Sequence, residues 1–256
     1  SGKSTLLQRN MIKLIKEKNN EVNLLTVEDP PEYPIPGARQ MPVTNANTEE
    51  EKAEQFGLAL NAALRSDPDV LMVGETRSLS AANLVFKGAL SGHLVWTTLH
   101  ANPAIVTRLR DMGVQSYMLG DPELLKGLVS QRLFQKLCPY CRMPAKEHLD
   151  NPAVKRLRIA LGDFGLENTF IKGPGCKFCN GRGIKGRLGI QEMILPDATF
   201  LQLMIGGETR KAIDYWTSDL NGRPMKDVAL ERMLKGLVGL DEVERWCGLL
   251  DQRPVY

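Results

Sequence analysis

The chain has 256 residues, of which 43% are hydrophobic and 25% are charged, and its formal net charge at pH 7 is +3. A chain of this length and composition can bury a large core, which excludes a disordered polymer and favours one large domain with a smaller one. No stretch approaches the roughly 18–20 apolar residues of a membrane span, and no signal-peptide pattern opens the sequence. We therefore expect a cytoplasmic protein.

Charge is distributed unevenly along the chain. The segment from Lys126 to Arg187 holds 13 basic and 4 acidic side chains, out of 33 and 30 in the whole chain. The rest of the sequence is therefore net acidic. A local excess of basic side chains is typical of a surface that binds an acidic partner, although an ordinary solvated face can have the same composition.

Short apolar strands alternate with helices in the first half of the chain. Apolar residues at helical spacing predict helices at 5–18, 49–65, 81–92 and 104–113. Continuous apolar runs predict strands at 22–27, 69–75 and 93–100. Strands that alternate with helices form a mostly parallel sheet covered on both faces, so we predict an α/β fold. Ligands of such sheets bind at the carboxyl ends of the strands, where acidic residues and a histidine follow here.

The sequence opens with Ser-Gly-Lys-Ser-Thr, which matches the second half of a Walker A phosphate-binding loop. Backbone N–H groups of such a loop hold phosphate, the lysine contacts the β and γ oxygens, and the serine hydroxyl binds Mg²⁺. The predicted nucleotide-binding residues are thus Ser1, Gly2, Lys3, Ser4 and Thr5, with Ser4 also binding magnesium. The alternative is a chance match. Because the first glycine of the motif and its preceding strand are not in this sequence, we expect the chain alone to bind ATP weakly.

A glutamate follows the second apolar strand. Glu75 ends the segment DVLMVGE, some 70 residues after Lys3. An acid at this place in a nucleotide hydrolase helps to hold Mg²⁺ and orients the attacking water. The alternative is a solvent-facing glutamate at a strand end. Arg77 lies two residues further on, where it either stabilises charge in the site or forms a surface salt bridge.

Four segments occur in a distinctive order: VEDPPEYPIPGARQMPV, LRSDPDVLMVGETRS, GHLVWTTLHANPAIVTRLRDMG and SQRLFQKLCPYC. They resemble the Asp box, Walker B motif, His box and four-cysteine module of the type II secretion and type IV pilus assembly ATPases. The similarity extends from Ser1 to the C-terminal LNGRPMKDVALERMLKGLVGLDEVERW. It implies a RecA-like P-loop ATPase core at 1–135, a zinc-binding module at 136–190 and a helical C-terminal region at 191–256.

The resemblance also implies roles for individual residues. The catalytic set contains Glu75, the Asp-box acids Glu28 and Glu32, Arg77, and His100 as the γ-phosphate contact. The set with secondary or interface roles contains His93, Asp29 and Arg108. For Asp29, a solvated acidic turn is an equal alternative.

Two details of this pattern need comment. His93 and His100 are seven residues apart, so alternation along a regular strand would point them to opposite faces. The family has Gly-Glu-Ile-Arg-Asp and a further acid after Walker B, whereas this chain has Ser78 and Ser80. Any role of the missing acids in metal or interface contacts is therefore not supported.

Four cysteines form two pairs with two residues between the members of each pair, Cys138 with Cys141 and Cys176 with Cys179. Two such pairs predict a tetrahedral zinc site, with two disulfides as the alternative. Thiols stay reduced in the compartment where ATP is used, which favours zinc. Four thiolates would fill the coordination sphere, so the site would be structural. We expect Cys247 to be a buried thiol.

The resemblance implies ATP hydrolysis that powers assembly of a type IV pilus or a type II secretion pseudopilus. The implied cofactors are ATP, Mg²⁺ and Zn²⁺. The implied partners are further copies of the chain in a hexamer, an inner-membrane platform protein and acidic phospholipids, with the protein cytoplasmic and peripheral to the inner membrane. No nucleic acid is expected, because no basic and aromatic side chains interleave. The alternatives are a retraction or conjugation-type DNA-transfer ATPase, and a catalytically silent ring scaffold.

Overall fold

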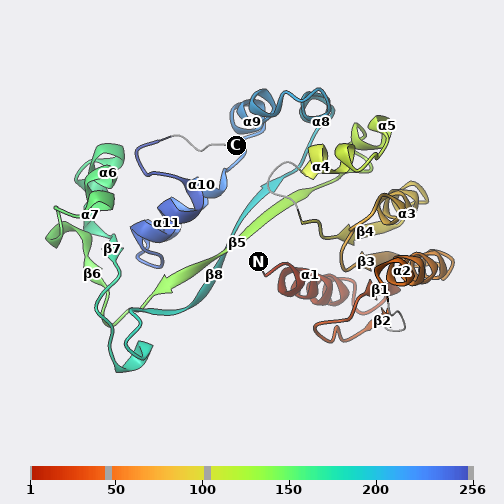
Figure 1. Cartoon of the computed structure of the whole chain (residues 1–256), viewed down its shortest axis with the longest axis horizontal. Coiled ribbons are helices and arrows are strands. Elements are labelled where there is room, and N and C mark those ends of the chain that lie inside the picture. Colours follow the sequence, from red (N-terminus) through yellow and green to blue (C-terminus); the bar gives the residue numbers. More distant parts are fainter. Residues whose placement is uncertain (1, 44–47, 101–104, 253–256) are drawn as a thin grey trace. The chain divides into compact units, whose positions relative to one another are not determined.

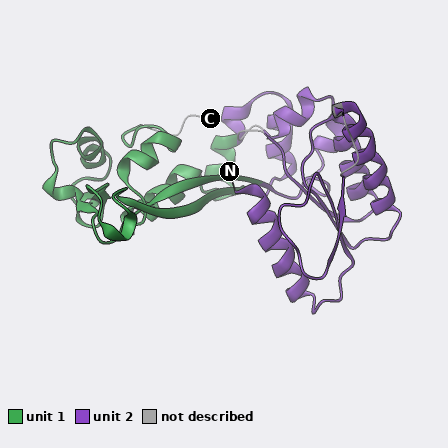
Figure 2. Cartoon of the chain, turned by 60° about the horizontal axis from the view of Figure 1, so that its bottom comes forward, with its two compact units in different colours: residues 1, 129–194, 213–256 green, residues 2–128, 195–212 purple. Residues whose placement is uncertain are grey.

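A computed structural model describes residues 2–43, 48–100 and 105–252. The chain folds into two compact units (Figure 2). The first, which we call the sheet unit, contains Gly2–Leu128 and Leu195–Ala212. The second, the cysteine unit, contains Val129–Ile194 and the chain from Ile213 onward. The three-part division implied by the resemblance stays a prediction.

The sheet unit is built on four parallel strands in the order β2-β1-β3-β4. Their bounds are β1 Leu24–Glu28, β2 Ala38–Pro42, β3 Val70–Val73 and β4 Leu94–Thr97. Helix α1 covers one face of the sheet, and helices α2 and α3 cover the other (Figure 1). These helices span Lys3–Glu17, Glu49–Leu64 and Leu79–Leu90.

The two central strands are buried on both faces, which explains why their sequences are continuous apolar runs. Leu24 and Val70 pack against the α1 side of the sheet. Leu25 and Leu71, one residue further along, pack against the α2 and α3 side. Successive side chains of each strand thus pack into two separate layers of the hydrophobic core, one on each face of the sheet. Both layers hold the strand ends in place.

The helices of the sheet unit begin at residues suited to that position. Gly2 precedes α1 with a φ of 78°, a left-handed conformation that glycine adopts without strain. The Thr48 side chain accepts a hydrogen bond from Glu51 N at the start of α2. Ser78 accepts one from Ala81 N at the start of α3, at 3.2 Å. These side-chain caps stabilise helices that begin close to the carboxyl edge of the sheet.

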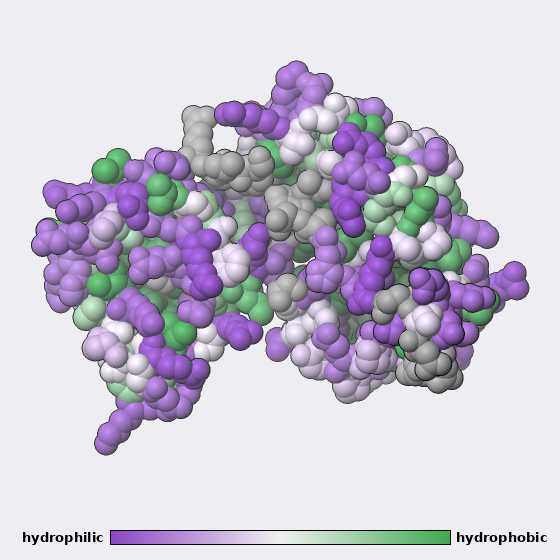
Figure 3. Space-filling view, in the orientation of Figure 1, coloured by the Kyte–Doolittle hydropathy of each residue, from purple (hydrophilic) through white to green (hydrophobic). Residues whose placement is uncertain are grey.

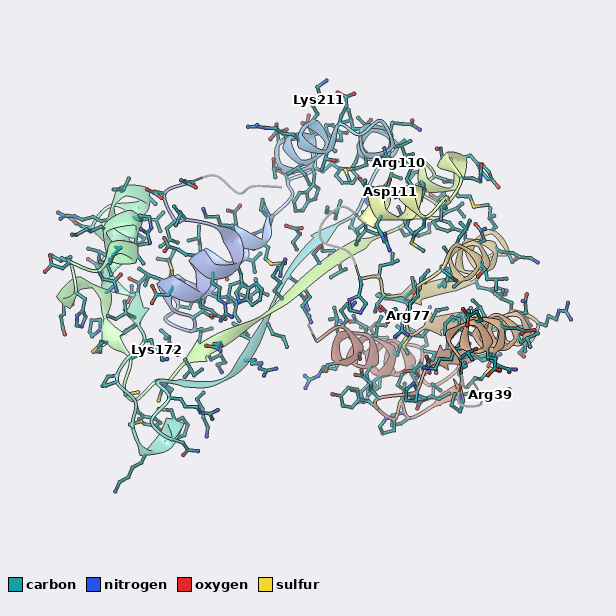
Figure 4. All side chains as sticks on the ribbon, viewed as in Figure 1. Arg39, Arg77, Arg110, Asp111, Lys172 and Lys211 are labelled. Carbon is teal, nitrogen blue, oxygen red and sulfur yellow. The ribbon has the colours of Figure 1, made fainter. Side chains whose placement is uncertain are left out.

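Three further helices complete the sheet unit: α4 Ile105–Asp111, α5 Ser116–Leu119 and α8 Ala198–Ile205. The guanidinium of Arg110 (labelled in Figure 4) donates to the Ile205 carbonyl at 2.8 Å. This bond joins α4 to α8, which is 95 residues away along the chain. The segment Leu195–Ala212 thereby packs with the sheet unit.

The cysteine unit contains two small sheets. Strand β5 (Leu128–Leu137) pairs with β8 (Ile184–Ile194), and β6 (Met143–Pro144) pairs antiparallel with β7 (Phe170–Ile171). Two 3₁₀ turns, η1 (Ala145–Glu147) and η2 (Lys177–Cys179), lie near these strands in the sequence. Its helices are α6 Pro152–Leu161, α7 Phe164–Glu167, α10 Met225–Leu234 and α11 Leu240–Cys247, while α9 (Thr209–Ser218) crosses the unit boundary.

The cysteine unit has an apolar core of its own. Phe134 and Ile190 from the long strands pack with Leu157 of α6, Met233 of α10 and Val243 of α11. All five side chains are at most 1% exposed. The unit therefore does not depend on its cysteines alone for burial.

The structure confirms the predicted α/β fold and parallel sheet, with shifted boundaries. The helix predicted from residue 5 begins at Lys3, and the strand predicted at 93–100 is only Leu94–Thr97. Among the described residues, no helix is both long and apolar enough to cross a bilayer. On the face in Figure 3 hydrophilic residues predominate, and hydrophobic residues form small scattered groups.

Candidate functional site

The carboxyl ends of β1, β3 and β4 are joined by hydrogen bonds just beyond the strands. Gly74 N donates to the Val27 carbonyl at 2.9 Å, and the Thr98 hydroxyl donates to the Gly74 carbonyl at 2.7 Å. Thr76 N donates to the Thr98 carbonyl at 2.9 Å. The residues that follow these strands are therefore held at one edge, as the parallel sheet predicts.

Glu75 contacts an arginine and a histidine side chain at this edge. His100 Nε2 lies 2.8 Å from Oε1 of Glu75, and Arg77 Nε donates to Oε2 at 2.8 Å. Arg77 (labelled in Figure 4) also lies 3.9 Å from Oδ2 of Asp29. The side chain of Glu75 is 18% exposed, against 78% for His100. The structure thus brings four of the residues singled out from the sequence into one contact network.

The phosphate-loop lysine lies at the same edge. Lys3 Nζ donates to the Leu99 carbonyl at 3.1 Å. Burial lowers the pKa of Lys3, and the negative charge of Glu75 opposes this shift. Ser4 and Thr5 lie half-buried in the first turn of α1. Ser1, the fifth residue of the predicted set, lies outside the described residues.

The first strand supplies a second acid. Glu28 is the last residue of β1 and is half-buried. Its Oε1 accepts hydrogen bonds from the Thr26 hydroxyl at 2.7 Å and from the Gln40 side-chain amide at 3.0 Å. Glu32 lies exposed in the turn that follows. The structure fixes Glu28 by two contacts and leaves Glu32 at the surface.

The two histidines lie at opposite ends of one short strand. His93 precedes β4 and is half-buried, whereas His100 lies three residues beyond its end. Both fall outside the regular strand, so the argument that alternation would point them to opposite faces does not apply. His93 lies at the opposite edge of the sheet from the acids. Arg108 is exposed on α4.

The serines that replace the family's acids after Walker B have a structural role. Ser78 caps α3, and its hydroxyl lies 2.9 Å from the hydroxyl of Ser80. Aspartate and serine are both good N-cap residues. The substitution therefore preserves the start of the helix while removing a negative charge close to Arg77.

The four cysteines of the two pairs meet in one cluster. All four sulfurs lie within 4.8 Å of one another, and three of the separations are 3.7, 3.8 and 3.9 Å. Four sulfurs at about 2.3 Å from a tetrahedral zinc lie about 3.8 Å apart, whereas a disulfide requires about 2.05 Å. The cysteines are free thiols in this structure. Their spacing therefore fits a zinc ion and does not fit two disulfides.

Backbone donors surround one of these sulfurs. Burial raises the pKa of Cys179, but the N–H groups of Cys176 and Gly183 donate to its sulfur at 3.2 and 3.1 Å and bring the pKa down to about 6. Burial and hydrogen bonds to the other cysteines raise the pKa of Cys141 to about 12. The backbone at Gly173 packs closely against Cys141, since a Cβ on Gly173 would lie 1.5 Å from the Cys141 carbonyl oxygen.

The fifth cysteine lies apart from the cluster. Cys247 ends α11, packs against the core of the cysteine unit and has its pKa raised to about 11 by burial. Cys247 is half-buried and is not one of the four clustered cysteines. It has the environment of an ordinary packed thiol.

Sequence reasoning did not identify two residues that contact Glu28. Thr26 lies inside an apolar strand and is fully buried, and Gln40 lies in the Asp-box segment, in a part for which the sequence predicted no strand. The backbone carbonyl of Leu99, which accepts from Lys3, carries no sequence signal at all. Only the pairing of β1 with β2 reveals the role of Gln40.

A parallel sheet with Gly-Lys-Ser at the start of its first helix, and with acids beyond its strand ends, defines the RecA-like P-loop class. A family model described as "Type II/IV secretion system protein" matches residues 1–245. The chain belongs to this family, as the resemblance in the sequence implied.

Individual relatives agree with this assignment. The type II secretion system protein E of Aeromonas hydrophila is 36% identical over 248 residues, which cover 96% of this chain and 46% of that protein. The type IV pilus assembly ATPase PilB of Thermus thermophilus is 35% identical over 223 residues, 86% of this chain and 24% of that protein. The chain thus spans about half the length of the Aeromonas protein and about a quarter of the length of the Thermus protein.

Solved structures support the fold. The crystal structure of the pilus retraction motor PilT with bound ADP has a TM-score of 0.62 and 23% sequence identity. The similarity covers 96% of this chain and 57% of PilT. At this level of identity the likeness establishes the fold alone.

Proposed function

We propose that this chain forms the nucleotide-hydrolysing part of an ATPase that powers assembly of a type IV pilus or a type II secretion pseudopilus. The observation that carries the proposal is the contact network at the carboxyl edge of the sheet, where Lys3, Glu75 and His100 meet. Membership of the secretion family supports the same function. The Aeromonas and Thermus relatives are both named for such machines.

Each group at this edge has a role in the proposal. Backbone N–H groups from Gly2 to Thr5 hold the phosphates, and Lys3 neutralises the β and γ oxygens. Glu75 and Glu28 orient the attacking water and accept its proton. His100 and Arg77 turn from Glu75 toward the transferred phosphate, where their N–H groups stabilise the negative charge of the transition state. His93, Asp29 and Arg108 act at a distance from the phosphates or between subunits, and Glu32 assists from the turn.

Oxygen donors at the edge suit magnesium. The Ser4 hydroxyl in the first turn of α1 and the nearby carboxylates are the ligand types that Mg²⁺ prefers. When bound, Mg²⁺ would neutralise phosphate charge. The four cysteines would hold a structural zinc, since their sulfur spacing fits a closed tetrahedral site.

We place the docking surface for membrane partners on the cysteine unit. Around the cysteine pairs, residues 136–146 and 172–187 contain basic but no acidic side chains. Lys177, Lys185 and Arg187 are exposed there, next to the exposed ring pair of Tyr140 and Phe178 with centroids 4.7 Å apart. Acidic phospholipids and an acidic loop of a platform protein both complement such a surface.

Reversing the charge of Lys177, Lys185 and Arg187 to glutamate tests the docking surface. We expect stimulation of ATP turnover by anionic liposomes, or by the platform protein, to be lost while basal turnover is kept. Reversal of Lys13 and Lys16, exposed on α1, is the control. Unchanged stimulation by both partners would exclude this surface.

Other functions of the family are the alternatives. A retraction motor or a conjugation-type DNA-transfer ATPase would use the same sheet edge, and PilT shares the fold. The four-cysteine cluster favours assembly, because the module resembles the assembly branch of the family. We further propose that the active form is a homo-oligomeric ring, a hexamer at the inner membrane. In this ring, neighbouring chains complete each site.

The test uses pilus or secretion output in a deletion strain complemented with the Lys3→Ala variant of the full-length protein. We expect output to be abolished, because in the proposal Lys3 neutralises the β and γ oxygens of the nucleotide. Lys13→Ala is the matched control, since Lys13 forms only an exposed ion pair with Glu17 on the same helix. Normal output from Lys3→Ala would contradict the motor and favour a silent scaffold.

A further inference from the structure

Glu28 is held by neutral donors, unlike the other acid at the sheet edge. The Thr26 hydroxyl and the Gln40 amide both donate to its Oε1, at 2.7 and 3.0 Å. Glu75 instead contacts an arginine and a histidine. Neutral donors orient a carboxylate without placing a positive charge beside it, which leaves its second oxygen for a water or a metal.

Gln40 makes two further contacts in the turn that carries the other Asp-box residues. Its Nε2 also donates to the Tyr33 carbonyl at 3.0 Å, and its Oε1 accepts from Ile35 N at 2.9 Å. A glutamine amide has two N–H donors and an acceptor oxygen. Both donors are engaged, one on the acid and one on the turn, so rotation of the amide would break all three bonds together.

Strand pairing explains why this glutamine can reach the acid. Thr26 of β1 and Gln40 of β2 are register partners, and Glu28 lies two residues beyond Thr26 on the same strand. Side chains two residues apart on a strand lie on the same face. The three polar side chains therefore line one face at the edge of the sheet, and β2 brings the amide there as the edge strand.

We propose that Gln40 is a positioning residue for ATP hydrolysis, which fixes the carboxylate of Glu28 and couples it to the turn containing Glu32. The inference rests on the proposed function of this site. One oxygen of Glu28 is occupied by Gln40 and Thr26, so the carboxylate has a fixed plane and offers its other oxygen to the attacking water. Loss of this constraint lets the carboxylate rotate and reduces the rate of the chemical step.

The first test compares Gln40→Met with Gln8→Met in the full-length protein. Methionine keeps the length of the side chain and removes the amide. Gln8 is the matched control, because its amide donates to the Pro34 carbonyl of the same turn but does not contact Glu28. We expect kcat for Gln40→Met to fall about 10- to 100-fold with KM for ATP changed by less than about threefold, and Gln8→Met to keep wild-type kinetics. Equal kinetics of the two variants would overturn the proposal.

A double-mutant cycle separates positioning from general loss of structure. In the Glu28→Ala background Gln40→Met should reduce kcat no further, because its only route to the reaction has been removed. A further loss equal to that in the wild-type background would show that the glutamine acts independently of Glu28, which contradicts the proposal. Thermal unfolding of each variant shows that the chain is folded.

Gln40→Glu gives a pH signature that a structural role would not produce. The introduced carboxyl keeps an acceptor oxygen in place of the amide oxygen but lacks the N–H donors of the amide. It faces Glu28 at hydrogen-bond distance. Two such carboxyls share one proton, and the protonated form can donate as the amide does. We expect turnover of Gln40→Glu, relative to wild type, to rise as the pH falls from about 8 to about 6. A constant ratio would contradict the proposal.

The outcomes distinguish this inference from the proposed function. If Lys3→Ala abolishes turnover while Gln40→Met is as active as wild type, the site hydrolyses ATP and only the positioning role is wrong. If Lys3→Ala turns over ATP normally, the proposed function itself is wrong, whatever Gln40→Met does.

Discussion

The two units assemble their functional groups in different ways. In the sheet unit Lys3, Glu75 and His100 are spread over most of the first hundred residues, and only the parallel sheet brings them to one edge. In the cysteine unit each half of the cluster is local, because two residues separate Cys138 from Cys141 and Cys176 from Cys179. The sheet unit depends on long-range topology, whereas the cysteine unit depends on local spacing.

The units also differ in what their functional groups do for the fold. The apolar layers under the sheet are complete without the acids, and His100 is mostly exposed. Cys138 and Cys179 are fully buried, and their sulfurs belong to the cluster that joins the two cysteine pairs. We infer that side chains at the sheet edge can be changed with little effect on stability, whereas the cysteines cannot.

The largest effect should follow from breaking the cysteine cluster. Cys179→Ser should remove about one zinc per chain and unfold the region around the two cysteine pairs, because structural zinc contributes on the order of 10 kcal/mol in small zinc domains. Amide hydrogen exchange should accelerate in residues 172–187 and remain slow in the central strands β1 and β3. Metal analysis with exchange mass spectrometry measures both.

Cys247→Ser is the matched control for the cluster. This thiol lies in the same unit, packs against its core and is not part of the four-sulfur group. It should retain the metal and the slow exchange of the wild type. If Cys179→Ser also retains both, the cluster does not hold a structural metal.

A smaller effect on stability, but a large one on turnover, should follow from Glu75→Gln. The amide keeps the shape of the side chain and cannot accept a proton, so turnover should fall at least about 100-fold. Nucleotide binding and the melting temperature should stay near wild type, because Glu75 lies at the edge and not in either apolar layer. Steady-state turnover, a fluorescent-nucleotide titration and thermal unfolding test this. Comparable low hydrolysis in the wild type and the variant would favour a scaffold.

The contrast between the units explains what could be predicted from the sequence. The central strands and their helices were predictable, because residues such as Leu71 and Val73 belong to unbroken apolar runs. Strand β2 was missed, since none of its residues is buried and it follows a proline-rich stretch. No strand was predicted at 128–137 or 184–194, where many half-buried and exposed residues obscure the alternation.

The candidate site shows the same division. Cysteine spacing predicted the four-sulfur group directly, and the predicted parallel sheet placed Glu75 and His100 at the carboxyl ends of strands, where the structure shows them in contact. The sequence did not predict the donors to Glu28, because the contact of Gln40 depends on the register between β1 and an unpredicted edge strand. The alternation argument for His93 and His100 does not apply, because the regular strand between them is only four residues long.

The smallest effect should come from Glu231, a carboxylate of the cysteine unit that resembles Glu75 in its contacts. Hydrogen bonds from Arg223 at 2.8 Å and Lys235 at 2.6 Å lower the pKa of Glu231 to about 2. A pKa below that of the unfolded chain stabilises the fold above about pH 4.5, and this contribution is lost as the pH falls toward 2. Glu231→Gln should therefore lower the melting temperature slightly at pH 7, by an amount that shrinks on acidification.

Measured beside Glu75→Gln, this variant tests whether contact with basic side chains is enough to mark a functional acid. Glu231 lies on α10, and its partners Arg223 and Lys235 flank the same helix, so its charge serves only local stability. Glu75 has one partner from its own strand end and one from the next strand, at an edge that also holds Lys3. Turnover should be unchanged in Glu231→Gln and lost in Glu75→Gln, because position at the strand ends, and not the pairing itself, makes a carboxylate catalytic. Equal turnover losses in the two variants would contradict this distinction.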